Sequence, residues 1–298
     1  MMANVLALVR VQEHAPEGGF DIKEMILHHL ADAPEWESPF GVVHLPQFAP
    51  VHLGPITIDF SITKHVLFMF AAAVLAAVVL ILAARDAKRE QAAGAGRGPK
   101  GAANVVEAFV LFLRDEVALR NIGHGGDRYV PYIVTVFFFI LFCNLLGLLP
   151  WGASPTGNVA VTAVLAVFTF ITVEIAGMRA LGARGYLKTI FYAPEGVSLG
   201  MKIPMYLIMT PVEFLGKLTK PFALAIRLYA NMTAGHAVVL ALTGLLVMAS
   251  LASALFVAPA PIIMAIAIML LEIFVAFLQA YIFAMLSAVF IGLIRHAH

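Results

Sequence analysis

Long runs of apolar residues constrain this chain more than any other feature of its sequence. Residues 65–84 read HVLFMFAAAVLAAVVLILAA, and residues 129–149 and 159–178 form similar runs. Each is close to the roughly 20 residues that a helix needs to cross a bilayer. Charged residues make up only 12% of the chain, against about 25% in soluble domains. The sequence therefore predicts an all-α integral membrane protein.

The last third of the chain contains two apolar stretches, at 203–249 and 259–294, that are far longer than an upright span requires. Helices of this length must be kinked, broken or steeply tilted within a bilayer. Pro204, Pro211 and Pro221 mark expected kinks or helix starts in the first stretch. With the three shorter runs, these stretches give five membrane-embedded helical units, of which the last two are long and steeply tilted.

Residues 102–120 are expected to form one further helix, which lies on the membrane surface. Val105, Phe109, Phe112 and Leu113 recur at helical spacing, while charged residues interrupt the apolar run. This pattern is typical of an amphipathic surface helix. A soluble linker helix is the alternative.

The chain divides into a polar segment and a membrane domain. Residues 1–60 contain eight Asp or Glu residues against Arg10 and Lys23, so we expect an acidic N-terminal segment outside the cytoplasm. Residues 61–298 form the membrane domain, with a loop expected over residues 185–196 after the third span.

Basic residues orient the membrane domain. Residues 85–128 carry eight of them and residues 179–202 carry four, whereas the turns at 150–158 and 250–260 carry none. Loops rich in Lys and Arg remain in the cytoplasm. We therefore expect the N-terminus outside and the C-terminus, which ends after Arg295, in the cytoplasm.

The sequence lacks the residues that several classes of protein function require. The net charge of +1 gives no indication of nucleic-acid binding, and the single cysteine, Cys143, lies in an apolar run. His28 and His29 are adjacent, so on a helix they point in different directions and form a poor metal pair. The first residues resemble a weak signal peptide at best. We expect no metal and no cofactor.

Polar residues within the last two apolar stretches are the candidate functional residues. They are Glu213, Lys217, Lys220, Arg227, Asn231, His236, Glu272 and Gln279. At about 100° per residue, Asn231 shares a helix face with Arg227, whereas His236 lies on the opposite face. Glu272 and Gln279 are two turns apart on one face of the final helix. We therefore expect His236 to face the final helix and form an acid–base pair with Glu272, while Arg227 and Asn231 face something else.

Structural roles are open alternatives for these residues. Arg227 could be a structural cation paired with Glu272, because such pairs occur in membranes. His236, Asn231 and Gln279 could hold helices together by hydrogen bonds. The remaining alternatives are interfacial positions for Glu213, Lys217 and Lys220, turn roles for Asn144 and Asn158, and an ion pair of Glu174 with Arg179.

Four stretches of the chain resemble one known family. KPFALAIRLYANMTAGH at 220–236 and LLEIFVAFLQAYIFAMLSAVFI at 270–291 closely resemble subunit a of the F-type ATP synthase. NLLGLLPWGASPTGNVAVT at 144–162 is similar to that family's turn between the second and third spans, and SITKHVLFMF at 61–70 to its first span. The resemblance covers about residues 60–298.

The resemblance implies a stator subunit of the membrane rotor. Arg227 matches the family's essential arginine, which faces a carboxylate on the rotating ring of c subunits, and Gln279 matches the glutamine opposite it. Glu213, Asn231, His236 and Glu272 match polar positions that line two aqueous half-channels. Some bacterial members carry Glu where this chain has His236, and His where it has Glu272. The exchange keeps one acid and one base.

The family's partners and location are implied in the same way. The expected partners are the c-subunit ring, the b-subunit peripheral stalk, the F1 sector and the lipid bilayer, in a bacterial inner membrane. Such a subunit is not an enzyme by itself but translocates ions within the complex. The alternative functions are a self-contained ion or anion transporter or channel, with Arg227 as an anion site, and a membrane enzyme.

Overall fold

The computed structural model describes residues 31–53, 56–92, 101–149, 151–191, 199–248 and 259–296. The chain forms two compact units. The first takes its residues from Met1–Ala76, Phe139–Asn158 and Leu228–Gln279, and the second from Ala77–Phe138, Val159–Arg227 and Ala280–His298.

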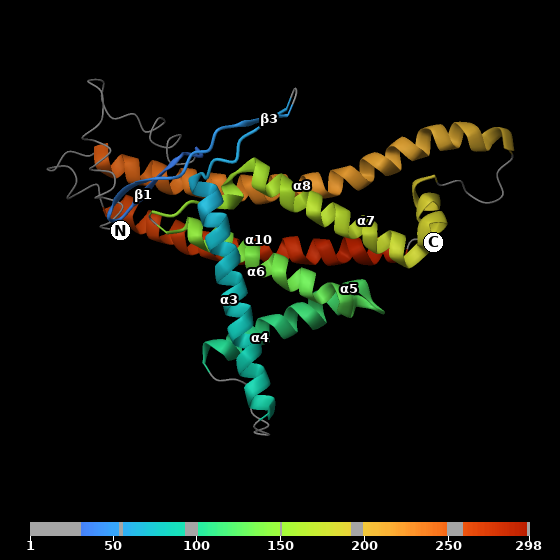
Figure 1. The fold of residues 1–298 in the computed structure, drawn as a ribbon, viewed down its shortest axis with the longest axis horizontal. Helices are drawn as coiled ribbons and strands as arrows, with labels where there is room; N and C mark the ends of the chain where they lie inside the picture. The colour runs from blue at the N-terminus through green and yellow to red at the C-terminus, as the bar shows by residue number, and fades with distance from the viewer. Residues whose placement is uncertain are drawn as a thin grey trace. The chain divides into compact units, whose positions relative to one another are not determined.

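Five long helices dominate both units (Figure 1). They are α3 (Lys64–Ala92), α6 (Val130–Gly147), α7 (Val159–Ile190), α8 (Leu199–Met248) and α10 (Pro259–Arg295). Each contains a segment long and apolar enough to cross a membrane, as judged by length and composition. The prediction of an all-α membrane protein with five embedded helical units is therefore confirmed.

The helices α8 and α10 are the two longest, with 50 and 37 residues. At 1.5 Å per residue they extend over about 75 Å and 55 Å, well beyond a hydrocarbon core of about 30 Å. Within the first unit, α3 runs steeply across the direction that α8 and α10 share (Figure 1). This geometry agrees with the steep tilt that their length predicts.

Three prolines lie inside α8 without ending it. The helix begins at Leu199 and continues through Pro204, Pro211 and Pro221, so none of these residues is a helix start. Membrane helices tolerate proline because neighbouring groups can satisfy the freed backbone carbonyls.

The helix α7 is longer than the expected third span over 159–178. Its backbone breaks at Gly182, where φ is 70° and ψ is 166°, and helical structure then continues to Ile190. Residues 185–190 are therefore helical, and their assignment to a loop was wrong. A glycine can adopt this positive φ at little cost, so the chain changes direction there without losing the helix on either side.

The expected surface helix over 102–120 consists of three continuous pieces. They are α4 (Ala102–Phe112), the π-helix η1 (Leu113–Leu119) and α5 (Arg120–Ile122). Its apolar face packs within the second unit: Phe109 stacks on Phe137 of α6, and Phe112 lies against Tyr281 of α10. Leu113, Val117 and Ile122 are fully buried. After α5, the short 3-10 helix η2 (Gly126–Tyr129) leads into α6.

The N-terminal segment contains two β-hairpins that its acidic composition did not indicate. The strands β1 (Glu35–Ser38) and β2 (Gly41–His44) pair antiparallel, as do β3 (Val51–Leu53) and β4 (Ile56–Ile58). The Trp36 indole of β1 donates a hydrogen bond to the Trp151 carbonyl at 2.8 Å and packs edge-on against Phe68 of α3. The first hairpin is thereby fixed to the start of the membrane domain.

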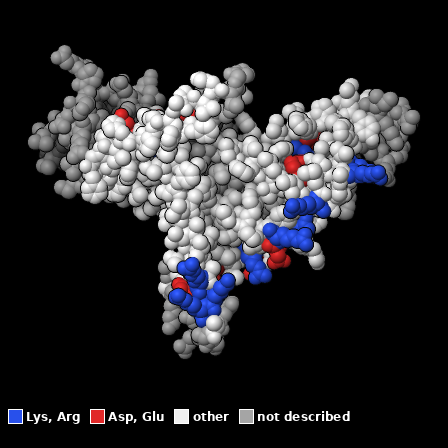
Figure 2. All heavy atoms as spheres, in the orientation of Figure 1, with Lys and Arg blue, Asp and Glu red and all other residues white. Residues whose placement is uncertain are grey.

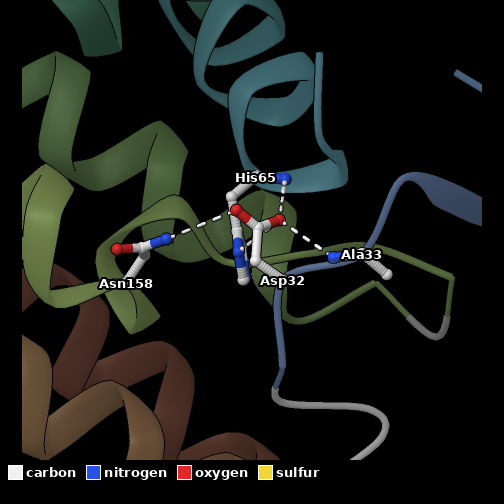
Figure 3. Close-up of polar contacts among 4 residues, drawn as sticks. All are labelled: Asp32, Ala33, His65 and Asn158. Atoms are coloured by element: carbon white, nitrogen blue, oxygen red, sulfur yellow. Dashed lines mark hydrogen bonds and ion pairs between the residues drawn. The ribbon is translucent and has the colours of Figure 1, made fainter. Parts of the chain in front are cut away.

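A polar cluster holds Asp32, three residues before this hairpin, against the start of α3 and against Asn158 (Figure 3). The Asp32 carboxylate lies 3.0 Å from Nδ1 of His65, a buried residue of α3. The Asn158 amide, just before α7, donates to the other oxygen of Asp32 at 3.5 Å.

Basic side chains gather on the second unit. Figure 2 shows Lys and Arg side chains over the end of α3, over α4 and α5, and near the end of α7. These are the segments that were expected to remain in the cytoplasm because they are rich in Lys and Arg.

Candidate functional site

One face of α8 carries most of the charged residues of this helix. Glu213, Lys217, Lys220, Arg227 and Asn231 follow one another at spacings of four, three, seven and four residues, which place them along a single stripe. We call these five residues the α8 polar stripe. A polar stripe of this length on a membrane helix requires polar partners or water.

Arg227 lies on this stripe with its side chain exposed. Among the described residues of its own unit, no carboxylate forms an ion pair with it. Its guanidinium keeps its charge at any physiological pH. A permanent cation on the exposed face of an apolar helix is suited to a counter-charge on another subunit.

Asn231, one turn beyond Arg227, bonds to the last helix. Its amide nitrogen donates to Oε1 of Gln279 at 2.9 Å, and Gln279 is only 2% exposed. The expectation that Asn231 faces away from the final helix was therefore wrong. Helical phase orders side chains around one helix, but it does not give the position of the neighbouring helix or the reach of a glutamine side chain.

His236 and Glu272 lie together, as their sequence phases predicted. Nδ1 of His236 is 3.9 Å from Oε1 of Glu272, and their side chains are 17% and 12% exposed. The helices approach closely here because residue 235 is glycine: a Cβ atom at Gly235 would overlap the Glu272 carboxylate. Glu272 is thus paired with His236, which argues against its use as the structural partner of Arg227.

Some polar atoms of this group have no partner within the chain. His236 Nε2, Gln279 Nε2 and Thr233 Oγ1 are buried and accept or donate no hydrogen bond among the described residues. Buried polar groups are nearly always satisfied by protein or water. Three such atoms in one unit indicate a region that water or another subunit completes.

A buried polar network in the first unit was missed by sequence reasoning. Asn144 of α6 is fully buried, and it accepts a hydrogen bond from Thr156 at 2.6 Å and donates to the Ala276 carbonyl of α10 at 3.4 Å. Ser154 extends the network to Thr156 at 2.8 Å. Asn144 is therefore not a turn residue. Its position inside the apolar run FCNLLG was the available signal.

One further expectation about a charged residue was wrong. Glu174 of α7 lies 3.8 Å from Lys217 of α8 rather than pairing with Arg179, and the Lys217 side chain is 11% exposed. Glu213, one turn before Lys217, is exposed.

The described part of the chain has no group of three or more His, Cys, Asp or Glu residues that could hold a metal ion. His28 and His29 lie outside the described residues.

A cavity of about 330 Å³ between α7 and α8 is lined by residues such as Phe170, Leu218 and Phe222. Its walls are almost entirely apolar and offer no charged ligands for ions.

The arrangement can perform proton transfer. His236 and Glu272 provide one base and one acid within the membrane-spanning helices, and the hydrogen-bonded amides of Asn231 and Gln279 lie on the same pair of helices. Ionisable residues inside a membrane commonly mark ion pathways.

The chain is similar to the members of one known family. Residues 66–292 match the family described as ATP synthase A chain. The chain is 47% identical over 271 residues to ATP synthase subunit a 2 of Chlorobaculum tepidum, which covers 91% of this chain and 72% of that one. It is 46% identical over 273 residues to ATP synthase subunit a of Myxococcus xanthus, which covers 89% of this chain and 85% of that one.

A third relative, ATP synthase subunit a of Chloroherpeton thalassium, is 44% identical over 268 residues, or 90% of this chain and 75% of the relative. The family match begins in α3 and ends in α10, so it includes the five long helices and the whole α8 polar stripe. This chain therefore belongs to the ATP synthase A chain family, the a subunits of F-type ATP synthases.

Proposed function

We propose that this chain couples proton flow across the membrane to rotation of a ring of c subunits. The proposal rests on the exposure of Arg227 and on its surroundings. It is exposed on the α8 polar stripe and has no ion-pair partner among the described residues of its unit, while Glu272 is engaged by His236. The counter-charge of Arg227 is then a carboxylate on the ring.

Arg227 acts on that carboxylate in two ways. A guanidinium close to a carboxylate favours its charged form, so a protonated ring carboxyl that reaches Arg227 releases its proton. Because arginine does not give up its own proton, it also blocks a direct proton transfer between the two sides of the membrane.

Two half-channels supply and remove the protons. The outer half-channel consists of polar residues of the first unit: Asn231, His236, Glu272 and Gln279, with the Asn144 network beside α10. The inner half-channel runs along the part of the α8 polar stripe that belongs to the second unit and begins at Glu213.

A proton from outside neutralises a ring carboxylate, which can then face lipid. After nearly a full turn of the ring, it leaves through the inner half-channel. Each proton that crosses 100 mV supplies about 2.3 kcal/mol to rotation. The length of α8 and α10 supports this role, because steeply tilted helices can follow the curved surface of a ring.

The proposed orientation places the N-terminus outside and the C-terminus in the cytoplasm of a bacterial inner membrane. The basic residues of the second unit support it, since positively charged loops remain in the cytoplasm. The proposed partners are the c-subunit ring, the b-subunit peripheral stalk and the F1 sector. The chain carries out no reaction alone but moves ions within this complex.

Purification and reconstitution test the proposal. A tagged chain should copurify with a ring-forming c subunit and with ATPase subunits, and vesicles that contain only the purified chain should not transport protons or anions. Vesicles that contain the complete complex should pump protons when ATP is added. Transport by the isolated chain would instead support a self-contained transporter or channel and contradict the proposal.

A further inference from the structure

An ion pair joins α7 to α8 in the second unit, and both of its side chains are largely covered by the protein. Oε2 of Glu174 lies 3.8 Å from Nζ of Lys217, and the two side chains are 14% and 11% exposed. Both residues belong to segments apolar enough to span the membrane. Ionisable side chains inside membrane helices are rare because of the cost of burying charge, and they usually have a function.

The Lys217 ammonium has two other partners on α7. It lies 4.5 Å from the centre of the Tyr186 ring and donates to the Thr189 hydroxyl at 3.4 Å. A second cation, Lys220, lies on the same stripe, 5.6 Å from the Phe290 ring of α10. Lys217 therefore remains held whether or not Glu174 is charged.

The geometry of the pair is that of a loose contact rather than a fixed bridge. A charge-assisted hydrogen bond between an ammonium and a carboxylate measures about 2.7–2.9 Å, shorter than the 3.8 Å found here. Burial disfavours the charge on Glu174, while the neighbouring ammonium groups favour it. Opposed influences of this kind allow a carboxylate to change its protonation state.

Lys217 also connects Glu174 to Arg227. Lys217, Lys220 and Arg227 lie on the same α8 polar stripe, and Lys217 precedes Arg227 by ten residues, about 15 Å along a helix. Glu174 thus contacts the stripe on the side of Arg227 that leads toward the basic segments.

We propose that Glu174 is a proton-carrying residue of the inner half-channel, and that Lys217 is the residue that positions it. The inference rests on the proposed function. A proton that leaves a ring carboxyl passes by water to the Glu174 carboxylate, which becomes a neutral carboxylic acid. It then passes to water on the cytoplasmic side, and Glu174 returns to its charged form. Lys217 stays protonated throughout and keeps its contacts with Tyr186 and Thr189.

Glu174→Gln tests this inference because it keeps the size of the side chain and removes its ability to carry a proton. In membrane vesicles that contain the complete synthase, ATP-driven proton pumping should fall by about one order of magnitude or more, as expected when a positioned acid–base group is lost from a proton-transfer step. The matched control is Glu116→Gln, which also removes a carboxylate from an ion pair of the second unit. That pair, with Arg120, lies on an exposed surface, so pumping should not change.

Glu174→Asp separates proton transfer from a structural role, and also covers the case in which Glu174→Gln prevents assembly. Aspartate keeps the acid and the charge but moves the carboxylate away from Lys217. The dependence of pumping on pH should shift when the cytoplasmic side is titrated and should not change when the outer side is titrated. Unaltered pH dependence on the cytoplasmic side would overturn the inference.

Arg227→Ala, measured in parallel, shows whether a negative result concerns only the role of Glu174 or the proposed function as a whole. If Arg227→Ala abolishes pumping while both Glu174 variants retain the rate and pH dependence of the unaltered protein, only the role of Glu174 is wrong. If Arg227→Ala leaves pumping intact, the proposed function fails and the role of Glu174 fails with it.

Discussion

Arg227, which cannot lose its proton, and Glu272, which can, lie in different surroundings. Arg227 is exposed on α8, whereas Glu272 is 12% exposed in its side chain and lies beside His236. At 3.9 Å, the histidine and glutamate are too far apart for a direct hydrogen bond, which needs about 2.7–3.2 Å. A small movement or one water molecule would connect them, as a proton relay requires.

The acid–base pair predicts a compensating exchange. His236→Glu and Glu272→His should each lower the rate of proton-driven ATP synthesis, because each leaves two acids or two bases in contact. The double variant restores one acid and one base, so it should recover more activity than either single variant. Equal or lower activity in the double variant would show that the two residues do not act as a pair.

The sequence predicted which residues form the site, but it did not predict the residues that several of them contact. Arg227, His236 and Glu272 are recognisable because each interrupts a long apolar run, and helical phase placed His236 toward Glu272 correctly. The partners of Asn231, Asn144 and Lys217 depend on where neighbouring helices lie. That information comes from tertiary packing and not from the period of a single helix.

At the scale of elements, the contact between α8 and α10 depends on small residues. Gly235 allows the Glu272 carboxylate to lie directly against the backbone of α8. Small residues let membrane helices approach closely, which brings polar side chains within reach of one another.

Substitution of Gly235 by alanine should damage function more than stability. The added Cβ would displace the flexible end of Glu272 from His236, whereas alanine is favoured over glycine in a helix by up to about 1 kcal/mol. We expect reduced proton pumping with an unchanged thermal unfolding temperature of the purified complex.

Gly216→Ala is the matched control for Gly235→Ala, since it lies on the same helix and a Cβ there would meet no atom within 4 Å. It should leave pumping unchanged. A Gly235→Ala variant that pumps as well as this control would contradict the role of the close approach.

The elements themselves were predictable where length and hydrophobicity decide them. All five long helices follow from apolar runs, because a polypeptide in lipid must satisfy its backbone within a helix. The hairpins at 35–44 and 51–58 and the extension of α7 beyond Gly182 were missed. The hairpins are short and are held by contacts such as Trp36 with Phe68, and a glycine after an apolar run usually ends a helix.

At the scale of the whole molecule, the candidate residues are divided between the two units. The boundary passes through α8 between Arg227 and Leu228, and through α10 between Gln279 and Ala280. The residues assigned to the outer half-channel belong to the first unit, and those assigned to the inner one belong to the second. Each proposed half-channel therefore belongs to one unit of the chain.

Thiol labelling tests the proposed orientation. Cys143 is the single cysteine and is buried, so a Cys143→Ala background allows new cysteines to be placed one at a time. A membrane-impermeant maleimide added to intact cells should label Phe40→Cys, whose native side chain is almost fully exposed at the tip of the first hairpin. Arg89→Cys, at the basic end of α3, should be labelled only after the membrane is opened. The reverse pattern would place the N-terminus in the cytoplasm.

The central claim is that Arg227 meets a carboxylate on the ring, and proton-driven ATP synthesis by an Arg227→Ala variant tests it most directly. Vesicles that contain the complete synthase are given an imposed proton gradient, with Arg89→Ala, an exposed arginine of α3, as the control. We expect Arg227→Ala to abolish synthesis while the subunit still copurifies with the ring, and Arg89→Ala to retain synthesis. Coupled ATP synthesis by the Arg227→Ala complex would show that Arg227 is not the group that meets the ring carboxylate.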